Sequence, residues 1–297
     1  MLTDSGLGGL SVLAHLTLKL NEGSNAGKRS GLKLVYINAV PRDGYGYNDM
    51  PSRKERISVF GCILEEVHSR YQPDRIFVAC GSLSALLEKL PFGQDHPGKL
   101  QGIDVLSRQM LEDAMEKYPG SQVFVFAAPT TISEKIYGRD AIKTANSELK
   151  IYGQPCPGLA SLISSDSEGA KVEDAVRGFC QEALARWDGS RADSGEGAPI
   201  VFLGCTHYSF RAESFVKAFA SLGYPEIQLI DPNPAAAEML AGIFREDGTR
   251  GQCELEFLTP YPLPASERIG MGRMLEDLSP QTAAAFRQAR VIPELAS

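Results

Sequence analysis

The sequence has 297 residues, of which 43% are hydrophobic and 23% are charged, and its formal net charge at pH 7 is −7. This composition is typical of a soluble globular chain that can form one large domain or two of moderate size, and it argues against extensive disorder. The acidic balance argues against a general binder of nucleic acid or of anionic membranes.

Targeting and metal-binding signals are not found in the sequence. No stretch approaches the roughly 20 consecutive apolar residues that a membrane helix needs. Residues 1–6 carry neither a basic segment nor a long apolar one, so we expect no secretory signal and predict a cytoplasmic protein. Six cysteines are too dispersed over the chain for a disulfide scaffold, and they form no closely spaced Cys/His cluster that would predict a metal site.

Short apolar runs alternate with segments of helical periodicity along the chain. Several runs are apolar at nearly every position, which is typical of parallel strands covered on both faces. The predicted strands span residues 32–39, 75–80, 122–128, 149–153, 199–205, 226–231 and 254–259. The predicted helices span residues 10–19, 52–71, 83–90, 105–117, 172–187 and 211–221, with a further helical pattern near 280–290. This alternation predicts an α/β fold.

A glycine-rich segment, DSGLGG at residues 4–9, precedes the first predicted helix. Its glycines permit tight turns that expose successive N–H groups at a helix start, an arrangement that binds anions. Ser11 stands where a dinucleotide-binding fingerprint would have its third glycine, so we do not expect a nucleotide site. The alternative is a glycine-rich helix start that Asp4 or Ser5 caps. Only three residues precede Asp4, which predicts a stub of a strand and a poorly fixed carboxylate.

Two further segments place a cysteine at the end of a predicted strand. Residues 80–82 have the sequence CGS, and residues 205–207 have the sequence CTH. Ligands bind beyond the carboxyl ends of parallel strands, and a helix N-terminus lowers the pKa of a thiol. Cys80 and Cys205 could therefore face one cleft as reactive thiols, with His207 as a proton partner. The alternative is that both cysteines are small buried hydrophobes and that His207 is structural.

In this combination the segments resemble the aspartate/glutamate racemase superfamily, and glutamate racemase most closely. The resemblance is carried by DSGLGGLSVL at residues 4–13, ACGSLSA at 79–85 and GCTHY at 204–208. Weaker matches lie at Tyr45-Gly46, Thr131, Ile132, Tyr137, Cys156-Pro157 and Asp231-Pro232. The resemblance extends over roughly residues 1–260, most of the chain.

The resemblance implies a cofactor-independent isomerase that interconverts L- and D-glutamate and supplies D-glutamate for peptidoglycan. It implies two parallel-sheet α/β domains of approximate twofold similarity, with the active site in the cleft between them. From the positions of the motifs we expect residues 1–97 and 211–297 in the first domain and residues 98–210 in the second. The partner would be a small amino-acid substrate, and a homodimer is left open.

The resemblance also implies a role for each site residue. The thiols of Cys80 and Cys205 would flank the α-carbon, one removing the α-proton and the other protonating the opposite face. Asp4 would assist Cys80, and His207 would assist Cys205. The expected substrate contacts are Ser5, Tyr45, Gly46, Gly81, Ser82, Thr131 and Thr206. Without a metal or a cofactor, the site itself must stabilise the charge that develops on the substrate.

The chain departs from the usual pattern of the family at several pocket positions. Gly81 stands in place of an Asn, which removes an amide expected to hold the substrate. The other departures are Gly44 for Pro, Ser82 for Thr, Ala128 for Thr, Glu134 for Ser and Ser164 for Glu. Each lost hydrogen bond to a charged substrate costs about 1.5–3 kcal/mol. Two alternatives therefore stay open: an aspartate- or hydantoin-racemase-like enzyme, and a non-catalytic binding protein.

Overall fold

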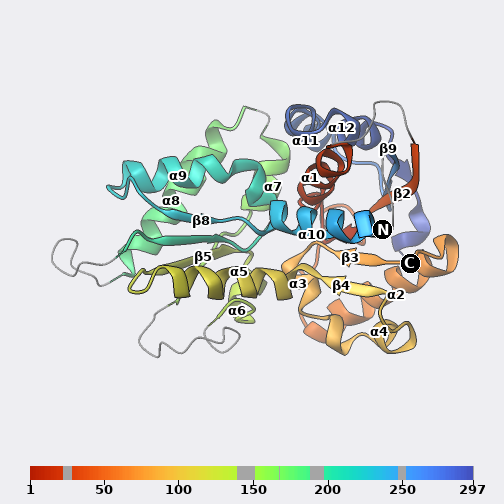
Figure 1. The fold of residues 1–297 in the computed structure, drawn as a ribbon, viewed down its shortest axis with the longest axis horizontal. Coiled ribbons are helices and arrows are strands. Elements are labelled where there is room, and N and C mark those ends of the chain that lie inside the picture. Colours follow the sequence, from red (N-terminus) through yellow and green to blue (C-terminus); the bar gives the residue numbers. More distant parts are fainter. Residues whose placement is uncertain (23–28, 139–150, 167, 188–196, 247–251, 297) are drawn as a thin grey trace.

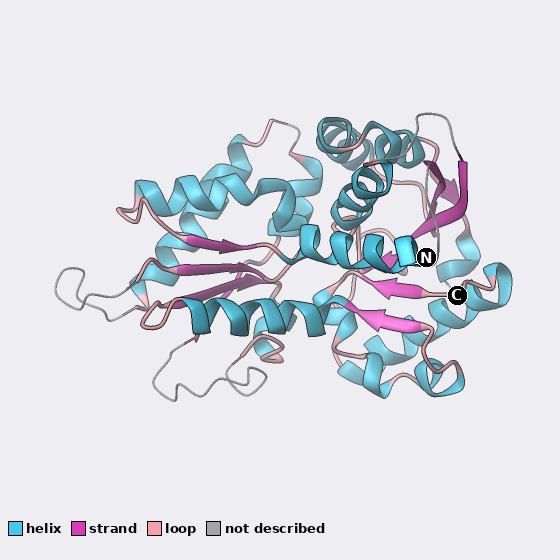
Figure 2. Cartoon of the chain, viewed as in Figure 1, coloured by secondary structure: helices cyan, strands magenta, loops and turns pink. Residues whose placement is uncertain are grey.

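The computed structural model describes residues 1–22, 29–138, 151–166, 168–187, 197–246 and 252–296. These residues form two parallel β-sheets with helices on both faces of each, which confirms the predicted α/β class. We call the part built on the six-stranded sheet the first lobe and the part built on the four-stranded sheet the second lobe. The strands of the two sheets point towards one another, so their carboxyl ends meet between the lobes (Figure 2).

The sheet of the first lobe has the strand order β10-β9-β2-β1-β3-β4, and every neighbouring pair is parallel. Its strands are β1 (Leu2–Asp4), β2 (Arg29–Asn38), β3 (Ile76–Val78), β4 (Leu100–Gly102), β9 (Gln252–Thr259) and β10 (Arg290–Val291). The predicted strands at 32–39, 75–80 and 254–259 coincide with β2, β3 and β9. The sequence analysis missed β4 and β10 because two or three residues are too short to show a periodicity.

Strand β1 corrects the expectation that Asp4 is poorly fixed. β1 lies between β2 and β3, and the N–H groups of Ala39 and Ala79 donate to the carbonyls of Asp4 (2.9 Å) and Thr3 (2.8 Å). Three residues suffice here because both edges of the strand are paired. The Asp4 side chain is buried at the end of this central strand.

The sheet of the second lobe has the strand order β6-β5-β7-β8, also all parallel. Its strands are β5 (Val123–Ala127), β6 (Ile151–Pro155), β7 (Ile200–Leu203) and β8 (Gln228–Ile230). Every residue of β5 and β7 is buried, because helices cover both faces of these central strands. This burial explains why their sequences are apolar at nearly every position.

Helices cover the sheets in four layers (Figure 1). One face of the sheet in the first lobe is covered by α1 (Leu10–Asn21), α10 (Pro232–Glu246), α11 (Ala265–Leu278) and α12 (Pro280–Arg287). The other face is covered by α2 (Arg53–Tyr71), α3 (Gly81–Ser84), η1 (Leu87–Lys89), α4 (Pro91–Asp95) and η4 (Pro293–Ala296). In the second lobe, α7 (Leu159–Ser165), α8 (Ala170–Ala185), η3 (Thr206–Arg211) and α9 (Ala212–Ser221) lie opposite α5 (Ile103–Lys117) and α6 (Pro129–Ser133). No helix in the described ranges is long and apolar enough to cross a membrane.

The strands divide the chain at positions different from the predicted limits of 98–210. β4, which lies inside those limits, pairs with β3 in the first lobe, and β8, which lies outside them, pairs with β7 in the second. The chain therefore enters the second sheet after β4, through α5, and leaves it after β8, where α10 begins. Motif positions located the cysteines but carried no information on strand order, which is why the limits differ.

The lobes also contact each other beside the cavity, where α11 packs on α7. Gly270 in α11 faces the backbone of Ser164 at the end of α7. An ideal Cβ on Gly270 would lie 2.3 Å from the Ser164 carbonyl oxygen. Only glycine lets the two helices approach so closely.

Gly270→Ala is expected to lower the free energy of unfolding by about 1–3 kcal/mol, because backbone atoms must move to admit the methyl group. Gly272 is the matched control: it lies in the same helix, and no atom lies within 4 Å of its ideal Cβ. Gly272→Ala is expected to raise the free energy of unfolding by up to about 1 kcal/mol through helix propensity. Urea unfolding of both variants measures the difference, and equal effects would contradict the close packing.

Candidate active site

A cavity of about 430 Å³ lies where the carboxyl ends of the two sheets meet. Its lining follows strands of both lobes: Asp4 ends β1, Cys80 comes after β3, Ala128 after β5 and Cys205 after β7. All eleven residues that the sequence analysis assigned to the site line this one cavity, namely Asp4, Ser5, Tyr45, Gly46, Cys80, Gly81, Ser82, Thr131, Cys205, Thr206 and His207. The structure thus brings the motifs together, while the role of each residue stays a prediction.

Cys80 lies between two hydroxyl groups. Its Sγ is 3.0 Å from Ser5 Oγ and 3.1 Å from Ser82 Oγ. Burial and, next, the negative charge of Asp4 raise the pKa of the Cys80 thiol, while the two hydroxyls and the N–H of Leu83 lower it. The prediction of a lowered thiol pKa is therefore wrong here. The N-terminus of a helix of only four residues stabilises the thiolate less than burial destabilises it.

Cys205 lies directly before η3, two residues after the end of β7. Its Sγ is 3.9 Å from Nδ1 of His207, a distance that a bound substrate can shorten. Burial holds the pKa of the Cys205 thiol well above its ordinary value, although the backbone N–H of His207 lowers it, so the predicted decrease is wrong for this cysteine as well. Burial lowers the pKa of His207 to about 4, and the imidazole is therefore neutral near pH 7 and a weak base in this structure.

Asp4 joins the lobes at the centre of the site. Its Oδ2 accepts a hydrogen bond of 2.9 Å from the hydroxyl of Thr206, which belongs to the second lobe. Burial raises the pKa of Asp4 to about 6, against the opposing effects of Thr206 and of the N–H groups of Gly6 and Gly9. Thr206 was predicted to contact the substrate; it lines the cavity, but its proton is directed to Asp4.

The glycines of the DSGLGG segment are explained by the same contact between lobes. An ideal Cβ on Gly8 would lie 2.3 Å from Thr206 Oγ1 and 2.5 Å from His207 Nδ1. An ideal Cβ on Gly6 would lie 3.3 Å from Cε1 of His207. Side chains at these positions would push η3 away, so the glycines permit close approach of the two lobes.

One end of the cavity is acidic, a feature that the sequence analysis missed. Asp43, Asp49 and Glu267 line this end, and none of the described lining residues is Lys or Arg. Burial and the charge of Asp43 raise the pKa of Glu267. The N–H of Gly46 already donates to Asp49 Oδ2 (2.8 Å), and the hydroxyl of Tyr45 donates to Glu55 (3.1 Å). No motif signalled these carboxylates, because they come from a loop and from the start of α11.

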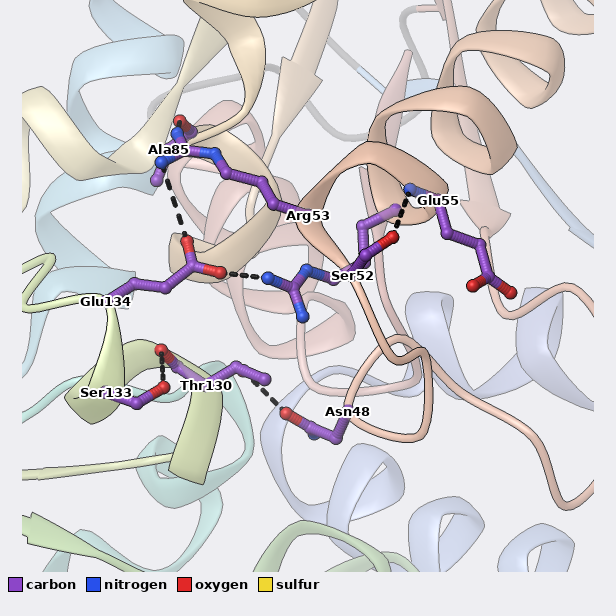
Figure 3. Close-up of polar contacts among 9 residues, drawn as sticks. Asn48, Ser52, Arg53, Glu55, Ala85, Thr130, Ser133 and Glu134 are labelled. Carbon is purple, nitrogen blue, oxygen red and sulfur yellow. Dashed lines mark hydrogen bonds and ion pairs between the residues drawn. The ribbon is translucent and has the colours of Figure 1, made fainter.

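A polar clamp connects the lobes beside the cavity (Figure 3). Glu134, directly after α6, forms ion pairs with Arg56 and Arg53 of α2, the second at 3.9 Å. Thr130 of α6 donates a hydrogen bond of 2.6 Å to Asn48 in the loop before α2. The clamp holds this loop and the start of α2 against α6. Glu134 is one of the departures from the family pattern, and its charge is used in this clamp.

Metal-ligating groups do not gather at the site or elsewhere in the described ranges: no set of three or more His, Cys, Asp or Glu side chains is placed to hold a metal ion. The chemistry that the cavity itself offers is acid–base chemistry of two thiols, a neutral imidazole and a buried carboxyl group.

No protein-family profile matches the chain, but individual proteins of known sequence and structure are similar to it. The chain is 27% identical over 251 residues to glutamate racemase from Carboxydothermus hydrogenoformans (84% of this chain, 81% of the relative) and 27% identical over 284 residues to that from Chlorobaculum tepidum (93% of each). The chain is a homologue of the glutamate racemases.

Solved structures show the same fold. Glutamate racemase from Francisella tularensis, in complex with D-glutamate, superimposes with a TM-score of 0.69 at 20% identity, over 99% of this chain and 96% of that one. The Escherichia coli enzyme, in complex with L-glutamate and the activator UDP-MurNAc-ala, gives a TM-score of 0.65 at 19% identity over 94% of each chain. This chain therefore has the fold of a glutamate racemase along nearly its whole length.

The raised pKa of Asp4 predicts a specific dependence of stability on pH. Because the folded state holds the proton more tightly than the unfolded state, the folded protein binds more protons between about pH 4 and pH 6. Stability should therefore fall as pH rises through this window and level off above it. The Asp4→Asn variant cannot titrate at this position and should lack this fall. Urea unfolding across the window measures the difference, and parallel curves for the two proteins would contradict the shift.

The clamp predicts a measurable coupling between Arg56 and Glu134, whose side chains are only 13% and 19% exposed. A double-mutant cycle with Arg56→Met and Glu134→Gln should give a coupling energy of about 1–3 kcal/mol. The exposed pair Arg287–Glu276 (56% and 50%) is the control and should give about 0.2–1 kcal/mol. Equal coupling in the two cycles would show that the clamp does not hold the lobes together.

Proposed function

We propose that this protein is a cofactor-independent glutamate racemase that interconverts L- and D-glutamate. One observation carries the proposal: two cysteines from the two lobes, each at the end of a strand, line a single cavity. Homology to glutamate racemases supports the choice of substrate. The product would serve the synthesis of peptidoglycan, as in the family that the chain resembles.

The proposed reaction removes a proton from one face of the α-carbon and adds a different proton to the opposite face. One thiol must first be a thiolate; it takes the α-proton of the bound enantiomer and becomes a thiol. The other thiol gives its proton to the opposite face of the carbanion and becomes a thiolate. The product has the inverted configuration, and the two sulfurs have exchanged protonation states, which proton exchange with water then resets.

Nearby groups would prepare each sulfur for its step. Neutral His207 would assist Cys205 by a hydrogen bond between its Nδ1 and the sulfur, which are 3.9 Å apart. Asp4, whose pKa is about 6, is largely ionised near pH 7 and would attract the ammonium group of the substrate. A positive charge beside a buried thiol favours its thiolate form, so substrate binding itself would lower the raised pKa of Cys80.

The hydroxyls of Ser5 and Ser82 lie against the Cys80 sulfur and would bind the polar groups of the amino acid there. The N–H of Gly81, as the first residue of α3, is offered to the α-carboxylate, whose charge grows when the carbanion forms. Thr131, from the second lobe, would complete the wall of the cavity together with Tyr45 and Gly46.

The acidic end of the cavity favours one second candidate, a racemase for a substrate without a second carboxylate, such as a hydantoin. Asp43, Asp49 and Glu267 would repel a distal carboxylate, and Asp49 already occupies the N–H of Gly46. Parallel assays with L-glutamate, L-aspartate and a chiral hydantoin separate the candidates. Turnover of glutamate alone rejects the second candidate, and turnover of the hydantoin alone rejects the first.

Cys80→Ser and Cys205→Ser should each lower kcat with glutamate by about 10²–10⁴-fold, since each removes one proton-transfer group. Proton NMR in D₂O, followed at the α-proton with chiral analysis of the product, measures the reaction. Cys62→Ser is the control, because Cys62 is exposed and is not among the lining residues of the cavity. Full activity in either cavity variant would contradict the two-thiol mechanism and favour a non-catalytic role for that cysteine.

A further inference from the structure

Tyr137 reaches the residue that follows Cys80. Gly81 is the first residue of α3 in the first lobe, whereas Tyr137 follows α6 in the second lobe. An ideal Cβ on Gly81 would lie 2.4 Å from the hydroxyl oxygen of Tyr137 and 3.3 and 3.5 Å from its Cζ and Cε2. The phenol therefore fills the space that any side chain at position 81 would need.

The same ring also contacts the residue that precedes Cys205. An ideal Cβ on Gly204 would lie 3.3 Å from Cδ2 of Tyr137 and 3.0 Å from Cβ of Ala127. Gly204 follows β7 directly, and its N–H donates to the carbonyl of Phe126 on β5 (2.8 Å), which fixes its position. Tyr137 thus lies between the backbone next to one cysteine and the backbone next to the other.

The ring is held rigidly in this place. Tyr137 is only 4% exposed, and it packs on Phe202 of β7 with ring centroids 4.8 Å apart. Helix α5 supplies Ser107, Asp104 and Arg108 near its hydroxyl, and the last two form an ion pair of 2.9 Å. A buried, packed ring cannot swing aside at low cost, so it keeps the backbone at Gly81 and the backbone at Gly204 at a fixed distance from each other.

We infer that Tyr137 is a positioning residue whose ring sets the separation of Cys80 and Cys205. The two cysteines follow strands of different sheets. The ring contacts Gly81, next to Cys80, and Gly204, next to Cys205, and because both are glycines it can touch both backbones. This inference rests on the proposed function for its importance in catalysis. Proton transfer at two faces of one carbon needs both sulfurs within reach at once, and a displacement of about 1 Å can cost about 10²-fold in rate.

The test exploits the different distances from Gly81 to the hydroxyl and to the ring. In Gly81→Ala the new methyl group would collide with the hydroxyl of Tyr137 at 2.4 Å, so kcat should fall at least about tenfold. In Gly81→Ala/Tyr137→Phe the nearest atoms become Cζ and Cε2, at 3.3 and 3.5 Å, which a small adjustment accommodates. The double variant should therefore recover to within about threefold of Tyr137→Phe alone, a strong non-additivity.

The kinetic constants distinguish a change of spacing from a general loss of structure. A changed spacing should lower kcat more than it changes KM, and it should raise the primary isotope effect with α-deuterated glutamate, because proton transfer becomes slower relative to the other steps. Urea unfolding confirms that each variant is folded. A folded double variant as slow as Gly81→Ala, or a Gly81→Ala variant with unchanged kcat, would overturn the inference.

A second readout does not depend on racemase activity. In a Cys62→Ser background, the short bifunctional thiol reagent dibromobimane should cross-link Cys80 to Cys205, with the product located by peptide mass spectrometry. The rate of cross-linking should change in Gly81→Ala and return in the double variant. If this pattern appears but no glutamate is turned over, the inference about Tyr137 is supported and the proposed function is wrong. An unchanged rate of cross-linking in all variants would overturn the inference that Tyr137 sets the separation of Cys80 and Cys205.

Discussion

The buried hydrogen bond from Thr206 to Asp4 links the carboxyl ends of the two sheets, and the geometry of the cavity depends on it. The bond joins the central strand β1 of the first lobe to the start of η3, directly after β7 of the second. It forms only because Gly8 lets η3 approach to a distance that a methyl group would block. Asn233, at the start of α10, supports the same turn by donating to the carbonyl of Thr206 (2.9 Å). A displaced η3 would carry Cys205 and His207 away from Cys80.

Burial is the dominant electrostatic influence on the site. It raises the pKa of both thiols and of Asp4, and it lowers the pKa of His207. Every one of these shifts favours the uncharged form, which lets four titratable groups share a small cavity without mutual repulsion. The cost is that thiolate formation must wait for a positive charge. In the proposed reaction the substrate brings that charge as its ammonium group, so the thiolate forms only when there is a proton to remove.

The sequence predicted that the motifs meet at one cleft because they stand at strand ends, and the structure brings them to one cavity. β3 and β7 are apolar throughout, and the rule that ligands bind beyond the carboxyl ends of parallel strands placed Cys80 and Cys205 at one cleft. The pairing of β1 on both edges was not predictable from three residues. The limits of the lobes were also missed, since the short strand β4 shows no periodic pattern.

Properties that arise from tertiary contacts were beyond the sequence analysis. The raised thiol pKa values depend on how deeply the lobes bury each sulfur, which local helix arguments cannot give. Gly81 was interpreted as the loss of an amide, but its structural correlate is the phenol of Tyr137, which enters from a segment more than fifty residues away and fills the vacated space. The acidic end of the cavity combines a loop with α11, two regions that no shared motif connects.

The most direct test of the account is the isotopic composition of the first product formed from L-glutamate in D₂O. Two thiols on opposite faces predict that D-glutamate carries deuterium at its α-carbon from the first turnovers, while the unreacted L-glutamate still carries protium. This follows because the proton that leaves on one sulfur is not the one that the other sulfur delivers. Early D-glutamate that retains the original proton would contradict the two-thiol arrangement, since it would require a single group that works on both faces.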